Sequence, residues 1–141
     1  MTIPVKESTS ETALVGKVTG IGGVFFKAKG DPKLLADWYS KNLGVKVQPW
    51  GGAILKGNES KPGDDGDSAW MICGKNSEKF EHSHSDFIVN YRVDDLDKLT
   101  ERLKKNGVTF VKEPTADEYG KFVSIVDPDG NRIELWEPAG S

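Results

Sequence analysis

Residues 121–137, KFVSIVDPDGNRIELWE, decide the fold of this 141-residue chain. The stretch begins with β-forming residues at 122–126 and resumes with a second apolar run at 132–136. Between the two runs lie Pro128, which presets φ for a turn, and Gly130, which readily takes a positive φ. The sequence therefore predicts a β-hairpin that closes the chain.

The second strand of this hairpin carries two different faces. Ile133 and Leu135 share one face, and Arg132, Glu134 and Trp136 share the other, because strand side chains alternate. The apolar pair is expected to pack against a helix. Glu134 is then either a structural carboxylate paired with Arg132 or a group directed into a pocket, and the hairpin alone leaves both interpretations open.

The composition is that of a single soluble domain. Apolar residues make up 36% and charged residues 29% of the chain, and the formal net charge is -3. Lys and Arg are scattered, so we expect neither a nucleic-acid nor a membrane partner. No apolar run is long enough to span a bilayer, and the polar start lacks the apolar segment of a signal peptide. Cys73 is a lone cysteine, which excludes an internal disulfide, and we expect a cytoplasmic protein.

One order of elements occurs twice along the chain. Residues 1–17 are polar and are expected to form a poorly ordered or edge tail, whereas 18–138 are expected to form one domain. Within that domain, a first unit at about 20–75 and a second at about 86–137 each contain a strand, a helix and three strands. This repeat indicates a duplicated supersecondary unit.

The two predicted helices, at 31–44 and 94–107, match in detail. Each begins with an Asp cap (Asp31 and Asp94), continues with leucines at helical spacing and ends at a glycine. Strands are expected before the closing hairpin at 21–29, 45–47, 53–56, 68–74, 86–93 and 108–111, and a flexible loop at 57–67. The predicted class is α+β: two tandem βαβββ units form a curved, mostly antiparallel sheet around a cleft, with the helices on its outer face.

Two motifs, YRVDDLD at 91–97 and DPDGNRIELW at 127–136, together with the helix before Gly44, carry a family resemblance. The chain resembles the vicinal oxygen chelate superfamily, which includes glyoxalases, bleomycin-resistance proteins and extradiol dioxygenases. The resemblance covers roughly residues 21–138. It implies a cleft inside a U-shaped sheet that often holds a divalent metal, with one ligand from the first and one from the last strand of each unit.

The ligand positions implied by the resemblance are largely empty of donors. The last position falls on Glu134, but Val24 (or Gly23, if the register slips by one) and Ile88 stand at the two first-strand positions. The last strand of the first unit offers only residues 70–72, none of them a carboxylate. Zinc, nickel, iron and manganese sites need at least two or three N, O or S donors from the protein. We therefore expect no bound cofactor, with a divalent metal as the less favoured alternative.

The resemblance also implies which residues surround the cleft. Glu134 is the candidate base or anionic contact, and His84 is an alternative metal ligand in a register unlike that of the family. The expected ligand-binding residues are Val24, Phe26, Trp50, Trp70, Ile88, Tyr91, Arg132 and Trp136. Core filling is the competing interpretation for the strand tryptophans.

Two functions follow from this pattern. The first is a metal-poor, glyoxalase- or bleomycin-resistance-like protein that binds a small aromatic or amphipathic molecule. The alternative is a metal-dependent lyase, isomerase or dioxygenase that uses Glu134 with atypical ligands. A domain that serves only to bind another protein is a third interpretation. The resemblance further implies a homodimer, and the sequence does not decide whether the chain is an enzyme.

Overall fold

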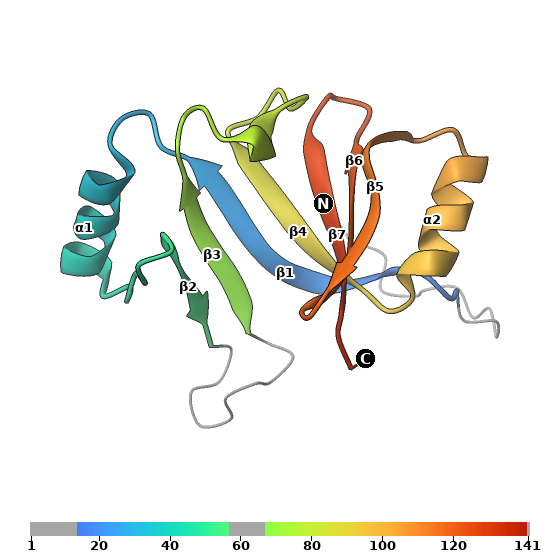
Figure 1. The fold of residues 1–141 in the computed structure, drawn as a ribbon, viewed down its shortest axis with the longest axis horizontal. Helices are drawn as coiled ribbons and strands as arrows, with labels where there is room; N and C mark the ends of the chain where they lie inside the picture. Colours follow the sequence, from blue (N-terminus) through green and yellow to red (C-terminus); the bar gives the residue numbers. More distant parts are fainter. Residues whose placement is uncertain (1–13, 57–66, 141) are drawn as a thin grey trace, which may run out of the picture.

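The computed structural model describes residues 14–56 and 67–140, so the predicted tail up to residue 13 and residues 57–66 of the predicted loop at 57–67 lie outside the described residues. The described elements, in chain order, are β1 (Val18–Lys27), α1 (Pro32–Leu43), β2 (Gly52–Leu55), β3 (Ser68–Cys73), the 3₁₀ helix η1 (Glu78–Phe80), β4 (Phe87–Val93), α2 (Leu96–Lys105), β5 (Thr109–Asp117), β6 (Gly120–Val126) and β7 (Arg132–Pro138). In Figure 1 the two helices lie at opposite sides of the molecule, with the strands between them.

The strands form one sheet in the order β2-β3-β1-β4-β7-β6-β5. The two units meet where β1 pairs with β4 in antiparallel orientation. The pairs β1–β3 and β4–β7 are parallel, and the remaining pairs are antiparallel. The predicted fold class, two tandem units of the βαβββ type in a mostly antiparallel sheet, is therefore confirmed, with two rather than three strands after the helix in the described part of the first unit.

Both helices begin and end through local capping. The Asp31 side chain accepts a hydrogen bond from the Lys33 N–H, and Gly44 ends α1 with φ 71°. In α2 the cap is Asp95, which accepts from the Lys98 N–H. The prediction that Asp94 caps this helix is wrong by one residue, because the Asp94 carboxylate instead accepts hydrogen bonds from backbone N–H groups of the segment before β1.

Two predicted strand boundaries also need correction. Residues 45–47 form no strand, because the Gln48 N–H bonds to the Gly52 carbonyl and turns the chain sharply before β2. In the second unit, β5 extends to Asp117, beyond its predicted end at residue 111. Pro114 is accommodated there because β5 is an edge strand whose pairing with β6 is irregular around it.

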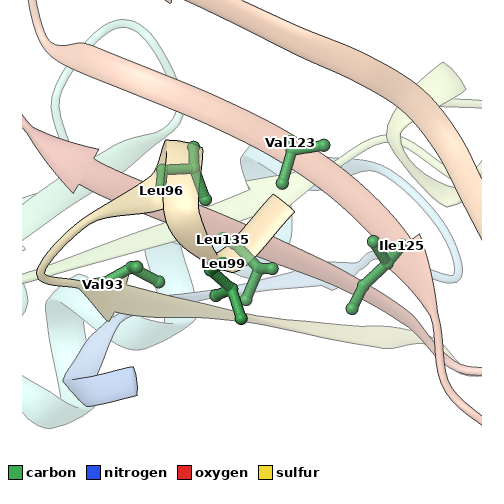
Figure 2. Packing of buried hydrophobic residues seen from close by; sticks show 6 residues of the cluster. All are labelled: Val93, Leu96, Leu99, Val123, Ile125 and Leu135. Carbon is green, nitrogen blue, oxygen red and sulfur yellow. The ribbon is translucent and has the colours of Figure 1, made fainter. Parts of the chain in front are cut away.

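Both helices cover the same face of the sheet. Under α2 lies a cluster formed by Val93, Leu96, Leu99, Val123, Ile125 and Leu135 (Figure 2). Under α1 lies a second cluster, formed by Phe26, Ala28, Ala53, Trp70 and Ile72. Ile133 and Leu135 thus pack against a helix, as predicted. We call the opposite side of the sheet the inner face. A third cluster lies there, formed by Phe25, Cys73, Phe80 and Ile88.

Candidate functional site

A line of residues crosses the inner face at the middle of the sheet. Strand register joins Ala69 of β3, Gly23 of β1, Asn90 of β4, Glu134 of β7 and Ser124 of β6. Neighbours in register lie side by side on one face of a sheet. We call this set the polar line. It contains Glu134 in the second unit and Ala69, which stands at the corresponding position of the first unit.

Glu134 is held in the polar line by two partners. Its Oε1 accepts a hydrogen bond of 2.7 Å from Asn90 Nδ2. Its Oε2 lies 3.5 Å from Lys79 Nζ, and the Glu134 side chain is only 16% exposed. The same ammonium lies 4.3 Å from the centroid of the Phe25 ring. Glu134 therefore faces the inner side as an ion-paired carboxylate, and Lys79, rather than Arg132, is its cationic partner.

Arg132 has a different task. It is 8% exposed, and its Nη1 donates to the backbone carbonyls of Glu78 (3.1 Å) and Glu81 (3.2 Å). Its Nη2 donates to Ser124 Oγ at 3.4 Å. Both carbonyls belong to residues 77–85, the segment that contains η1 and that we call the strap. Arg132 thus fixes the strap over the inner face.

Other contacts hold the strap in place. Ser77 caps η1 by accepting from the Lys79 N–H, and Phe80 is buried in the inner cluster. At its far end the His84 N–H donates to the Gly130 carbonyl of the β6–β7 turn at 2.9 Å. The strap therefore closes one end of the inner face and brings the Lys79 ammonium to Glu134.

A cavity of about 580 Å³ lies between the strap, β5 and the inner face. Such a volume suits a small organic ligand. The rings of Phe25 and Phe122 contribute apolar wall. Five carboxylates line it: Glu78, Glu81, Glu113, Asp117 and Glu134. Three cationic side chains line it as well: Lys79, Lys112 and Arg132. Leaving His82 out of the count, carboxylates exceed cations by two.

Three side chains of the first unit lie on the helix-covered face of the sheet and not, as predicted, on the face that lines the cavity. Val24, Phe26 and Trp70 belong to the cluster under α1 and do not line the inner cavity. The Trp70 ring meets Tyr39 of α1 edge-on, with centroids 5.1 Å apart. Phe25 takes the inward position instead. Gly23, which a one-residue slip of register placed at the ligand position, is the β1 member of the polar line.

The second unit needs two corrections. Ile88 does lie on the inner face, but it is fully covered by the inner cluster, and Asn90 rather than Ile88 stands beside Glu134. Tyr91 packs with the cluster under α2. In the first unit, Trp50 does not line the inner cavity either: it is half exposed in the turn before β2 and lines a separate cavity beside α1.

Trp136 has the expected facing. Its ring stacks on Phe122, with centroids 6.0 Å apart, and Phe122 lines the cavity. Its Nε1 donates to the Tyr119 carbonyl at 2.8 Å, and the Arg92 guanidinium lies 5.4 Å from its ring. Trp136 is therefore a fixed aromatic group next to the cavity.

The residues of the polar line do not fit a divalent transition metal. Ala69 and Gly23 offer no donor, and both oxygens of Glu134 already have partners. The buried Asn90 Oδ1 has no hydrogen-bond partner, but it points at the β1 backbone, where a Cβ on Gly22 would collide with it. Within residues 14–56 and 67–140, no three His, Cys, Asp or Glu side chains are grouped as metal ligands. The alternative ligand His84 packs its ring against Gly130.

Comparison with known proteins identifies a family and several fold neighbours of this chain. The family model described as Glyoxalase/Bleomycin resistance protein/Dioxygenase superfamily matches residues 25–135. Among curated proteins, none matches the chain significantly. Neither helix in the described part of the chain has the length and apolar character needed to cross a membrane.

Several solved structures share the fold. Methylmalonyl-CoA epimerase from Mycobacterium tuberculosis is 23% identical with a TM-score of 0.58, and the match covers 92% of this chain and 94% of that one. A superfamily member from Vibrio splendidus 12B01 is 14% identical with a TM-score of 0.56 and coverages of 87% and 99%. The Mn(II)-bound glyoxalase from Novosphingobium aromaticivorans is 18% identical with a TM-score of 0.56, and the match covers 87% of this chain but 40% of that one.

Proposed function

We propose a function from one premise: the chain belongs to the Glyoxalase/Bleomycin resistance protein/Dioxygenase superfamily. On that fold, it binds a small aromatic or amphipathic molecule, uncharged or mildly cationic, in the cavity under the strap, without a transition metal. The observation that carries this proposal is the polar line. It holds a single carboxylate, Glu134, and its members Ala69 and Gly23 have no side chain that could bind a metal.

The walls of the cavity support this class of ligand. Phe25 and Phe122 give the cavity wall an aromatic character that favours a flat molecule. The excess of carboxylates over cations disfavours an anion such as a phosphate ester. Ser124 and Glu134 supply polar contacts that can orient a ligand. Binding is expected in the micromolar range, because stacking on two rings is partly offset by the cost of ordering the ligand.

The second candidate is a metal-dependent superfamily enzyme, a lyase, isomerase or dioxygenase that uses Glu134. It is favoured by fold neighbours such as the Mn(II)-bound glyoxalase. Elemental analysis after incubation with Mn²⁺ or Zn²⁺ separates the two candidates. We expect well under one equivalent of metal per chain. Near-stoichiometric metal that is lost in Glu134→Ala would overturn the metal-free proposal and favour the enzyme.

The test of binding is a matched set of ligands. We expect 1-naphthalenemethanol and 1-naphthylmethylamine to bind with a Kd on the order of 100 µM and 1-naphthoate at least about tenfold more weakly. Tryptophan fluorescence reports binding, since Trp136 stacks on cavity-lining Phe122. Trp136→Phe should remove most of the quenching, whereas Trp50→Phe should preserve it. Tightest binding by the naphthoate, or quenching that depends on Trp50, contradicts the proposal.

The proposal includes a cytoplasmic homodimer that binds neither nucleic acid nor membrane. Its support is an exposed apolar surface on α1, the turn before β2 and β2 itself. Six large exposed apolar residues lie on these elements, and we call them together the α1–β2 surface: Leu34, Trp38, Leu43, Trp50, Ile54 and Leu55. Exposed apolar residues concentrated on neighbouring elements favour an interaction site.

A further inference from the structure

The Lys79 ammonium occupies a small, well-formed cation site. It lies over the Phe25 ring, 4.3 Å from the centroid, and 3.5 Å from Glu134 Oε2. Asn90 Nδ2 holds the other carboxylate oxygen of Glu134 at 2.7 Å. An aromatic face combined with an oriented carboxylate is the arrangement that recognises an organic ammonium. We call Phe25, Asn90 and Glu134 together the ammonium seat.

The seat and its occupant differ in how firmly they are held. The three seat residues lie on β1, β4 and β7, at the centre of the sheet. Lys79 reaches the seat from the single turn η1 through a flexible four-carbon stem, and its side chain is 30% exposed. Partly exposed ion pairs contribute little net free energy. The ammonium can therefore leave the seat while the seat keeps its shape.

We propose that the ammonium seat is a ligand subsite and that Lys79 is its internal occupant. A ligand that carries an ammonium group next to an aromatic ring displaces the Lys79 side chain, places its own ammonium between Phe25 and Glu134, and lays its ring towards Phe122. This inference rests on the proposed function and narrows the ligand class to aromatic amines protonated at neutral pH. Arg132 does not compete for the seat, because it is engaged by strap carbonyls.

The test removes the internal occupant and measures amine binding. In Lys79→Met the seat is vacated and the excess of carboxylates in the cavity rises, so the Kd of 1-naphthylmethylamine should fall about tenfold. The affinity for 1-naphthalenemethanol should change less than about twofold, since an alcohol does not need the seat. Lys79→Arg keeps the positive charge and should show no gain.

Lys27 is a matched control. Its ammonium also pairs with a carboxylate, Asp86 Oδ1 at 3.4 Å, and lies 5.3 Å from the centroid of the Phe80 ring, but neither Lys27 nor Asp86 lines the cavity. Lys27→Met removes the same charge from the protein, so a general electrostatic effect would appear in both variants. We expect the amine Kd of this control to stay within about twofold of the wild-type value.

Displacement has its own signal in the wild-type chain. Because the Lys79 ammonium lies over the Phe25 ring, the ring current should shift the Lys79 ε-methylene resonance. This resonance should move towards its random-coil position when the amine binds but not when the alcohol binds. Unchanged amine affinity in Lys79→Met, an equal gain in Lys27→Met or Lys79→Arg, or an unmoved resonance overturns the displacement. If the alcohol still binds in that case, the proposed function stands. If neither ligand binds, the proposed function fails and the inference fails with it.

Discussion

At the scale of single residues, Asp94 joins two distant segments of the chain. Its Oδ1 accepts hydrogen bonds from the N–H groups of Gly16 (3.0 Å) and Lys17 (2.8 Å), and its Oδ2 lies 2.9 Å from Lys17 Nζ. These contacts, led by the side-chain hydrogen bond with Lys17, lower the pKa of the Asp94 carboxyl from 3.8 to about 2. The ionised carboxylate therefore fastens the segment before β1 to the start of α2.

This lowered pKa predicts a pH-dependent contribution to stability. Asp94 binds a proton more weakly in the folded than in the unfolded chain, so its stabilisation is fully present above pH 4 and is lost as the pH falls towards 2. Urea unfolding of wild type and Asp94→Asn should differ most at pH 5–6, with wild type more stable, and should converge near pH 2. Glu101→Gln, on the exposed side of α2, is the control. A wild-type advantage that does not change with pH contradicts the assignment.

For Glu134, the sequence predicted the face of the sheet but not the partners of the carboxylate. Alternation around the apolar pair Ile133 and Leu135 was enough to place its carboxylate opposite the helices. Its partners were not predictable in the same way, because Asn90 is 44 positions away and Lys79 reaches it from another element. The presence of Asn90 could have been found by continuing the alternation backwards from Val93, which packs under α2.

At the scale of elements, the strap is the feature that sequence patterns missed. Residues 75–85 are polar and read as a connector, yet Phe80 is buried on the inner face. One apolar residue in a short turn gives no periodicity from which burial can be predicted. A similar limit applies to β1, where Val24, Phe25 and Phe26 are consecutive apolar residues. Both faces of that strand are covered, so alternation could not show which side faces the cavity.

Arg132 is the residue on which the strap depends, and its replacement tests that role. Arg132→Met should lower the free energy of unfolding by about 1–3 kcal/mol, because it leaves backbone carbonyls and Ser124 without their donor. Hydrogen exchange of amides in residues 78–84 should accelerate while the amides of α2 keep their protection.

Arg102 offers a matched comparison for this prediction. It also donates to two backbone carbonyls, those of Val15 and Gly16, but on the helix side of the sheet. Arg102→Met should accelerate exchange near residues 15–17 and leave the strap unaffected. Equal exchange in the strap of wild type and Arg132→Met would show that Phe80 and Ser77 are sufficient to hold it.

At the scale of the whole molecule, the repeat predicted from sequence is present but incomplete. In the second unit β5 lies beside β6, whereas the corresponding position beside β2 is empty within the described residues. The difference arises after the helices, because residues 45–48 turn sharply where their counterparts extend into β5. The duplication was predictable from the sequence, because the two helices have matching lengths, caps and terminal glycines. The loss of one edge strand depends on local turn geometry, which the valines at 45 and 47 did not reveal.

The empty strand position adjoins the α1–β2 surface, and together they predict how two chains associate. The six side chains of that surface are 42–69% exposed. Among the described residues β2 is an edge strand, and an edge strand next to such a surface favours pairing with a second copy. Light scattering at micromolar concentration should therefore give twice the 15.4 kDa chain mass.

Trp38→Glu combined with Ile54→Lys should give monomers, because charges buried at the interface lose hydration without gaining partners. Tyr119→Lys, an exposed aromatic residue outside this surface, should remain dimeric. A wild-type monomer, or a dimer that survives the double substitution, would mean that this surface does not join two copies of the chain.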